Sequence, residues 1–157
     1  AGWYSDSDCI HKVADNAELS ISVNSSVHYY AKFVKSSTKV MYFDPNTNWT
    51  TNKNERFAAY VYEKSTGDGK WYSMTEDASH NCYTFTMDAS GKYDMIIFSR
   101  MNGNTTENSW DNEWNRTPGA HGGKVEGIAI PTDGTNCFVQ ATGNDGWDNC
   151  GGSWTTK

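Results

Sequence analysis

The chain has 157 residues, a formal net charge of −6 and 13 scattered Lys and Arg residues. This length fits one domain that can bury about two thirds of its unfolded surface, and the lack of a basic stripe argues against nucleic acid or an anionic membrane as partner. No apolar run reaches the roughly 18 residues of a transmembrane helix, so we expect no membrane insertion. Seven Trp, nine Tyr and six Phe stand out in an otherwise hydrophilic chain.

The N-terminal region, residues 1–38, contains two predicted strands after a polar lead. Leu19, Ile21 and Val23 alternate with polar residues, and residues 27–33 repeat the alternation. The turn-forming segment 24–26 separates the two runs, which predicts an N-terminal β-hairpin.

Residues 39–140 show almost no helical periodicity and several short runs typical of strands. The predicted strands are 40–43, 56–62, 71–74, 82–87, 94–99, 125–130 and 136–140. Turn-forming segments separate them at 44–46, 66–69, 89–91 and 131–134. This pattern predicts an all-β, antiparallel, immunoglobulin-like β-sandwich that carries the added N-terminal hairpin.

Two further segments lack a strand pattern. Residues 101–123 carry Trp110 and Trp114 and are predicted to form a structured surface loop of the kind that often binds ligands. Residues 141–157 are predicted to be a C-terminal tail. The whole chain, 1–157, is therefore predicted to be a single domain made of the extension 1–38, the sandwich 39–140 and the tail 141–157.

The cysteines lie at Cys9, Cys82, Cys137 and Cys150, without a CxxC pair or a histidine at zinc-ligand spacing. We therefore expect two disulfides rather than a metal site. Three pairings are possible. Cys82 and Cys137 each open a predicted strand, so a bridge could join these strands side by side and leave Cys9 to pair with Cys150.

Acceptor sequences for N-linked glycans occur at four positions, each with Ser or Thr two residues on. They are Asn24, Asn48, Asn104 and Asn115. If these carry glycans they must lie on solvent-facing turns, and the alternative is that they are plain surface loops. Together with the cysteines and a chain that begins at Ala1 rather than Met, they predict an extracellular, secreted glycoprotein whose signal peptide has been removed.

From about residue 39 to 140 the chain resembles the starch-binding β-sandwich modules of bacterial α-amylases, carbohydrate-binding families twenty-five and twenty-six. The resemblance covers about two thirds of the chain, and the order and spacing of its segments are more specific than any single segment. These segments are 40–44 with Trp49, 56–62, 71–75, 95–98 with 100–102, 108–115 and 131–136.

The resemblance implies a noncatalytic sandwich in which a few aromatic side chains form a curved shelf for α-glucan. The positions that match the family shelf are Tyr60 and Trp71, whereas the aromatic residue expected two positions before Tyr60 is Ala58. Alternation on the strand 56–62 places Phe57 and its alternate neighbours in the core, so Tyr60 and Tyr62 are expected to face outward. Trp49, Trp110 and Trp114 are further binding candidates, with loop anchoring as the alternative for each.

Catalytic motifs are missing from the sequence. It has no nucleophile elbow, phosphate loop or HExxH motif, so an enzyme is not expected. The carboxylate pairs 76–77 and 111–113 could suggest a glycosidase, but neighbouring residues on a strand point apart. No cofactor is predicted. A structural calcium ion could be bound by Asp6, Asp8, Asp145 or Asp148, although no calcium-loop motif occurs and solvated turn acids are the preferred interpretation.

Two functions follow from these patterns. The first is a secreted, noncatalytic carbohydrate-binding module whose partner is a polysaccharide or glycan. The second is a glycosylated structural subunit of an extracellular filament, sheath or surface coat. In that case the strand Leu19, Ile21 and Val23 would complete a sheet of a neighbouring copy, because a strand edge pairs readily with another chain. Pairing of this strand within its own chain is the alternative.

Overall fold

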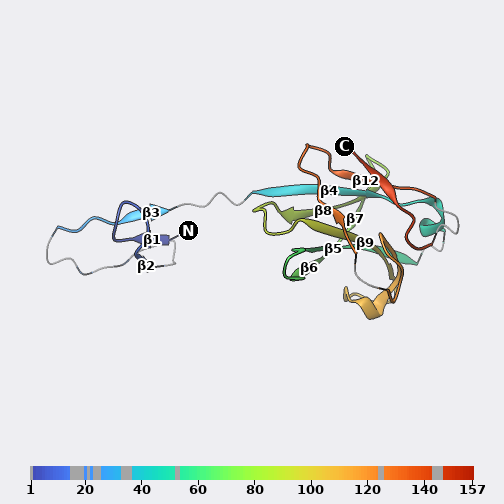
Figure 1. Ribbon diagram of the computed structural model, residues 1–157, viewed down its shortest axis with the longest axis horizontal. Helices are drawn as coiled ribbons and strands as arrows, with labels where there is room; N and C mark the ends of the chain where they lie inside the picture. The colour runs from blue at the N-terminus through green and yellow to red at the C-terminus, as the bar shows by residue number, and fades with distance from the viewer. Residues whose placement is uncertain are drawn as a thin grey trace. The chain divides into compact units, whose positions relative to one another are not determined.

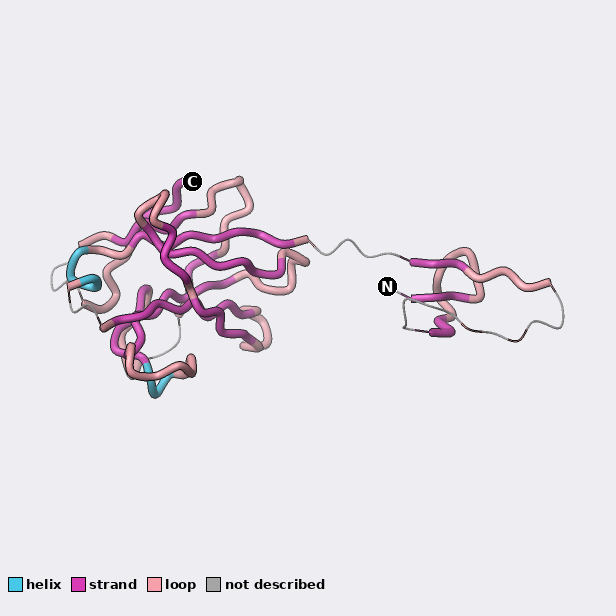
Figure 2. The backbone as a smooth tube through the Cα atoms, turned by 180° about the vertical axis from the view of Figure 1, so that it is seen from behind, coloured by secondary structure: helices cyan, strands magenta, loops and turns pink. Residues whose placement is uncertain are grey.

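The computed structural model describes residues 2–14, 20, 22, 26–32, 37–51, 54–123, 126–142 and 147–157. The chain is nearly all β and divides into two compact units, residues 1–36 and residues 37–157. The sequence predicted a single domain in which the extension ends at residue 38 and the sandwich begins at residue 39, and that division stays a prediction. Figures 1 and 2 show the two units, and each is described by itself below.

The first unit is a small antiparallel sheet with the strand order β2-β1-β3. Its strands are β1 (Gly2–Tyr4), β2 (Lys12–Ala14) and β3 (Tyr30–Lys32). Asp6 closes the turn between β1 and β2, because its carboxylate accepts hydrogen bonds from the backbone N of Ile10 at 2.9 Å and of His11 at 2.7 Å. β3 belongs to the second predicted strand of the hairpin and pairs with β1. Leu19, Ile21 and Val23, which define the first predicted strand, lie outside the described residues.

The second unit contains two sheets. The first has the order β13-β12-β4-β8-β7 and the second has the order β10-β9-β5-β6, with β11 also paired to β9. The first sheet comprises β4 (Thr38–Asp44), β7 (Thr75–Asp77), β8 (Cys82–Asp88), β12 (Cys137–Gln140) and β13 (Gly152–Thr155). The second comprises β5 (Glu55–Tyr62), β6 (Gly69–Ser73), β9 (Met95–Asn102), β10 (Glu113–Thr117) and β11 (Ile128–Ala129). Pairing is antiparallel throughout except between β12 and β4.

The two sheets pack face to face in a sandwich-like arrangement, which Figure 1 shows with β4 and β12 above β5 and β9. Phe43 of β4 stacks on Phe98 of β9 with ring centroids 4.5 Å apart, so these rings join the two sheets. The buried core cluster consists of Met41, Phe43, Trp49, Phe57, Ala59, Val61, Met74, Phe85, Met87, Ile96, Phe98 and Phe138. Each large side chain in it stabilises the fold by about 1.5–3 kcal/mol through burial.

The period-2 pattern of residues 56–62 explains this core directly. Phe57, Ala59 and Val61 point inward and are at most 1% exposed, so the alternate residues of β5 lie on the outer face of the second sheet. The prediction of an all-β sandwich is confirmed.

Several segments differ from their predicted structure. β10 lies inside the predicted loop 101–123, and β13 lies inside the predicted tail. Each strand is defined by pairing with the strand that precedes it in the chain, β9 for β10 and β12 for β13, and local alternation gave little sign of them. Two short 3-10 helices, η1 (Thr47–Thr50) and η2 (Trp110–Asn112), carry two of the tryptophans. None of the helices in the described part of the chain is long and apolar enough to span a membrane.

Candidate functional site

A pair of aromatic side chains marks the outer face of the second sheet. Tyr60 of β5 and Trp71 of β6 are directly opposite each other in the antiparallel ladder, and their ring centroids are 5.1 Å apart. Both side chains are only partly buried. Opposed residues on one face of a sheet lie close enough to form a common surface. The sequence-predicted shelf residues Tyr60 and Trp71 are therefore brought together.

Trp110 of η2 completes a cluster of three rings. Its ring centroid lies 4.9 Å from that of Tyr60 and 4.5 Å from that of Trp71. η2 lies on the side of the second sheet that faces away from the first sheet, as Figures 1 and 2 show. We call Tyr60, Trp71 and Trp110 the aromatic shelf.

The shelf is supported from behind by an arginine. The Arg116 guanidinium carbon lies 4.5 Å from the centroid of the Trp110 ring, which is a cation–π contact. Arg116 is 3% exposed, and its Nε and Nη2 both donate to Oε1 of the equally buried Glu113, at 2.7 and 2.5 Å. The other oxygen of Glu113 accepts from Ser99 Oγ at 2.7 Å. This buried ion pair holds one face of Trp110.

Gly69 allows the Tyr60 ring to lie close to the backbone of β6. A Cβ at residue 69 would stand 2.4 Å from both Cζ and the hydroxyl oxygen of Tyr60. Burial, with the nearby charge of Asp68, raises the pKa of the Tyr60 phenol above its ordinary value. The phenol therefore stays protonated at neutral pH and can donate a hydrogen bond.

The segment from residue 103 to 109 packs over the position of Ala58, where the resemblance predicted an aromatic residue. Arg56 fastens this segment by donating to the carbonyl of Thr105 at 2.7 Å and to the side chain of Asn108. Asn108 in turn donates to Ser73 Oγ at 3.0 Å, and Ser73 is the ladder partner of Ala58. Ala58 is fully buried on the same face as Tyr60, so an aromatic ring there would have no room. Trp110 is the third ring of the shelf and comes from η2.

Two of the predicted binding residues are buried, Trp49 in the core and Tyr62 on the outer face of β5. Trp49 is fully buried against Phe43 and Phe57, and its Nε1 donates to the carbonyl of Trp147 at 2.7 Å. Tyr62 is 8% exposed, and its hydroxyl accepts from the backbone N of Gly127 at 2.8 Å. The expectation that Trp49 offers a ring face to a ligand is wrong, because it is fully buried among core rings, whereas Tyr62 still lines a hollow at the surface.

Trp114 lies at a second aromatic position, together with Trp147 and apart from the shelf. The buried guanidinium carbon of Arg100 lies 4.9 Å from the Trp114 ring centroid and 5.2 Å from that of Trp147. Its Nε donates to the carbonyl of Trp49 at 2.9 Å. Sequence reasoning missed Arg100 and Arg116. For Arg116 a signal was available, because it closely follows Trp110 and Trp114 in the sequence, whereas Arg100 has no tryptophan beside it.

The predicted glycan acceptors differ in their surroundings. Asn24 lies outside the described residues, and Asn48 is half-buried in η1. The side-chain oxygen of Asn115 accepts from Arg100 Nη1 at 3.3 Å. Asn104 is exposed in the turn after β9, and this position is the one that best suits a glycan. Glycosylation stays a prediction.

The predicted disulfides are not formed in this structure. Cys82 begins β8 and Cys137 begins β12, but β4 lies between these strands, so they are not side by side as expected. Neighbouring strands are about 4.8 Å apart, and a separation of two strands, about 10 Å, exceeds the roughly 7 Å that a disulfide can span. Both are buried free thiols, and burial raises the pKa of Cys137 to about 11. Cys9 is also a free thiol, and the Cys150 thiol donates to the carbonyl of Asp148 at 3.7 Å.

Metal-ligating side chains are not gathered together in the described part of the chain, where no group of three or more His, Cys, Asp or Glu residues could hold an ion. Asp6 accepts two backbone hydrogen bonds within the first unit. In the second unit, Asp148 accepts from the backbone N of Arg116 at 3.1 Å. Asp145 lies outside the described residues. Of the aspartates suggested for calcium, Asp6 and Asp148 therefore accept hydrogen bonds from backbone N–H groups.

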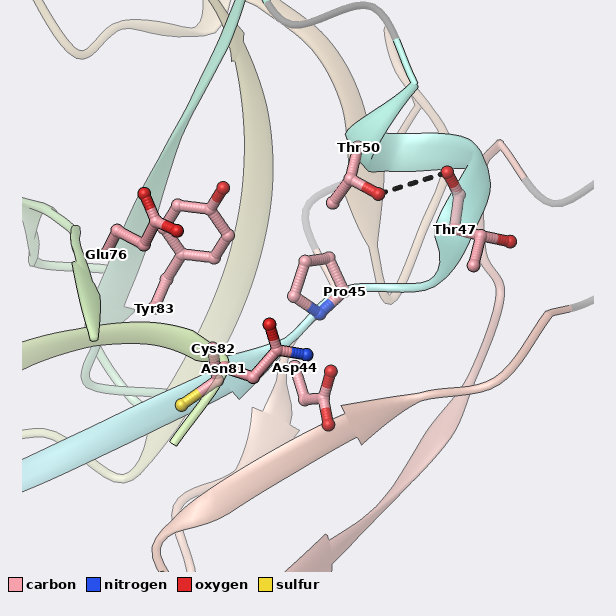
Figure 3. Close-up of a pocket in the computed structure, with 8 residues that line it drawn as sticks. All are labelled: Asp44, Pro45, Thr47, Thr50, Glu76, Asn81, Cys82 and Tyr83. Atoms are coloured by element: carbon pink, nitrogen blue, oxygen red, sulfur yellow. Dashed lines mark hydrogen bonds between the residues drawn. The ribbon is translucent and has the colours of Figure 1, made fainter. Parts of the chain in front are cut away.

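A polar hollow of about 340 Å³ lies between η1 and the strands β7 and β8. Figure 3 shows Glu76 beside the Tyr83 ring and the Asp44 carboxylate pointing in a different direction. Its lining residues are Asp44, Pro45, Thr47, Thr50, Glu76, Asn81, Cys82 and Tyr83. The two carboxylates in this lining, those of Glu76 and Asp44, point in different directions. They therefore do not form the facing pair of carboxylates that a glycosidase uses.

Comparison with known proteins gives no relative: no family model, curated protein or solved structure matches the chain significantly.

Proposed function

We propose that this chain is an extracellular, noncatalytic carbohydrate-binding module that holds a glycan of the α-glucan type on the aromatic shelf. The single observation that carries the proposal is the partly exposed cross-strand pair of Tyr60 and Trp71, with Trp110 packed against both rings. The faces of pyranose rings carry C–H groups that pack on flat aromatic side chains, whose faces are negative. The resemblance to starch-binding modules supports α-glucan as the first ligand to test.

Two rings of the shelf, those of Tyr60 and Trp110, are held by contacts with the rest of the protein. Gly69 fixes the position of Tyr60, while the ion pair of Arg116 with Glu113 fixes Trp110. Side chains that are already ordered lose little conformational entropy when a ligand binds. A glycan would therefore retain most of the free energy of its contacts with these rings.

The carboxylates near the shelf support a noncatalytic role. Glu113 is bound in its buried ion pair with Arg116 and is 3% exposed, so its charge is used inside the protein. Glycoside hydrolysis needs two carboxyl groups on either side of the scissile bond. Asp111, the other member of the pair considered from the sequence, is exposed on η2.

Isothermal titration of the full chain with maltoheptaose tests the proposal. We expect saturable binding that Trp71→Ala and Tyr60→Ala each weaken by about tenfold or more, because each removes one stacking ring. Tyr30→Ala is the matched control, since Tyr30 is an exposed tyrosine of the first unit. Lack of binding by the unaltered chain, or equal losses in all three variants, would contradict the proposal.

A second candidate function is a structural subunit of an extracellular filament, sheath or surface coat, in which the partner is another copy of the chain. It is favoured by the first unit, where no described residue is buried and four large apolar side chains are exposed. These are Ile10, Val13, Val27 and Tyr30. Small sheets with three-residue strands are at best marginally stable alone, so a partner would stabilise this unit. The proposed assembly strand, Leu19 to Val23, lies outside the described residues.

Light scattering during size-exclusion chromatography, with negative-stain imaging, distinguishes this candidate. Residues 37–157 contain all the described buried residues, so this fragment should fold by itself. A structural subunit should form regular particles as the full chain and remain monomeric as the fragment. If the full chain is monomeric at high concentration, the assembly candidate fails, and glucan binding can be tested independently on the same samples.

A further inference from the structure

A hollow of about 380 Å³ lies beside Tyr62, close to the aromatic shelf but separate from it. It is lined by Tyr62, Lys64, Met95, Glu126 and Gly127. Its volume is within the range of about 300–1,000 Å³ that small-molecule sites occupy. None of the three rings of the aromatic shelf lines it.

The position of this hollow continues the direction of β5. Tyr60 and Tyr62 lie on the outer face of that strand, and their ring centroids are 5.8 Å apart at an angle of 25°. Lys64 follows at the next alternate position, just beyond the end of β5. Alternate residues of a strand are about 7 Å apart along its axis. A chain-like ligand that leaves the shelf along β5 therefore meets the hollow next.

The walls of the hollow are fixed by close packing. Gly127 approaches Tyr62 so closely that a Cβ at residue 127 would stand 2.8 Å from Cε1 of its ring. The Gly127 amide donates to the Tyr62 hydroxyl at 2.8 Å, which leaves the hydroxyl proton able to point elsewhere. Met95 is the ladder partner of Tyr62 and covers the adjoining part of the wall.

Two charged side chains of opposite sign complete the lining. The backbone N of Lys64 donates to Asp94 Oδ1 at 2.8 Å, which fixes the start of this side chain. Lys64 and Glu126 are both exposed, so their ammonium and carboxylate groups are accessible. An ammonium donates and a carboxylate accepts hydrogen bonds, and a sugar unit with neighbouring hydroxyls can do both in return. The lining as a whole thus suits a neutral, hydroxyl-rich group with one apolar side.

We propose that this hollow is a further subsite for a linear oligosaccharide. The hollow binds the sugar units that extend past Tyr60 along β5, and Lys64 and Glu126 form hydrogen bonds with the hydroxyl groups of these units. This inference rests on the proposed function of the shelf. It predicts that the protein prefers longer chains to short ones, because only a longer chain reaches both the rings and the hollow.

Titration of the full chain with maltotriose and with maltoheptaose tests the subsite. Trp71→Ala should weaken both sugars, whereas Lys64→Met and Glu126→Gln should each weaken maltoheptaose by about tenfold and leave maltotriose unchanged, since a hydrogen bond to a charged group is lost. Lys92→Met is the matched control, because Lys92 is another exposed lysine and lies outside the hollow. Both altered residues are exposed, and a thermal melt of each variant verifies that the fold is retained.

Chemical shifts of the Gly127 amide give a second measurement that needs no variant. We expect this signal to move with maltoheptaose and to stay in place with maltotriose. Equal affinity for the two sugars, or hollow variants that behave like Lys92→Met, would overturn the subsite while the loss caused by Trp71→Ala still upholds the shelf. If the unaltered chain binds neither sugar, the shelf proposal and the subsite both fail.

Discussion

The Tyr60 ring rests against the backbone at Gly69, where even a methyl group would stand 2.4 Å from the ring. The two residues lie on adjacent strands of the outer face, and Trp71, the ladder partner of Tyr60, follows Gly69 by two positions. Glycine at residue 69 therefore sets the height of the tyrosine above the sheet. This contact determines whether Tyr60 and Trp71 form one surface.

Gly69→Ala should displace the Tyr60 ring and weaken binding of maltoheptaose by about tenfold, because the stacking contact with one ring is disturbed. Gly67→Ala is the matched control. Gly67 has a φ of +79° and no atom within 4 Å of its missing Cβ, so alanine there costs about 1 kcal/mol of backbone strain without touching the ring. Calorimetric titration and thermal melts of both variants separate the two effects. A loss of binding in Gly67→Ala alone would contradict this role of Gly69.

Arg116→Met should destabilise the second unit by about 3–5 kcal/mol, because the buried Glu113 would lose its buried partner and keep the exposed His121 imidazole, at 3.4 Å, and the Ser99 hydroxyl as contacts. Urea denaturation followed by tryptophan fluorescence measures the change, and Trp110 should also report the loss of its cation–π contact. The double variant Glu113→Gln with Arg116→Met should be clearly more stable than Arg116→Met alone. If both are equally destabilised, burial of the unpaired carboxylate is not the cause.

Alkylation by iodoacetamide without a reductant tests the cysteine chemistry. Cys82 and Cys137 should resist the reagent at pH 8 in the native protein, since both are buried and burial raises the pKa of each thiol, that of Cys137 to about 11. Both should react once guanidinium chloride unfolds the chain. Mass spectrometry of the peptides identifies the sites. A Cys82 to Cys137 bridge in the unreduced digest would refute the observed strand order.

Asp77 should make a pH-dependent contribution to stability. Its carboxylate accepts hydrogen bonds from Ser79 Oγ and from the His80 side chain, which lower its pKa from 3.8 to about 2. The folded state thus binds this proton less readily than the unfolded state, so the stabilisation is complete above about pH 4 and is lost as the pH falls towards 2. Asp77→Asn should have a lower melting temperature than the unaltered chain at pH 6.

The difference in melting temperature between the unaltered chain and Asp77→Asn should shrink from pH 4 to pH 2. Asp88→Asn is the control, because the Asp88 carboxylate closes a similar exposed turn by accepting from the backbone N of Ser90. A difference for Asp77→Asn that stays constant over this interval would show that the carboxylate charge is not responsible.

The sequence predicted the strands with local patterns better than those without them. Residues 56–62 alternate clearly, and β5 has the predicted core face of Phe57, Ala59 and Val61. In contrast, β10 carries Trp114, Asn115 and Arg116 in succession and is a strand because β9 pairs with it. Hydrogen bonding between two strands depends on how the chain folds back on itself. The alternation of side chains within one segment does not show this.

The tryptophans show the same division at the candidate site. Composition alone indicated that many rings must be either core or surface, and the family resemblance selected Tyr60 and Trp71, which the fold brings together. It did not separate Trp49, fully buried beside Phe43, from Trp110, which reaches the shelf from its loop. Both residues lie in polar segments of the sequence, so their sequence neighbours do not show which of the two is buried.

By itself, the sequence determined that the protein is a β-sandwich, because side-chain alternation follows from the geometry of each strand and acts within a few residues. Only the tertiary structure decided which rings form the aromatic shelf, which arginines support tryptophans and which cysteines are kept apart. Arg116 meets Trp110 through a bend of the chain, and β4 separates Cys82 from Cys137 through the order of the strands. These relationships depend on how the chain folds back on itself, which brings together residues that are not neighbours in the local strand pattern.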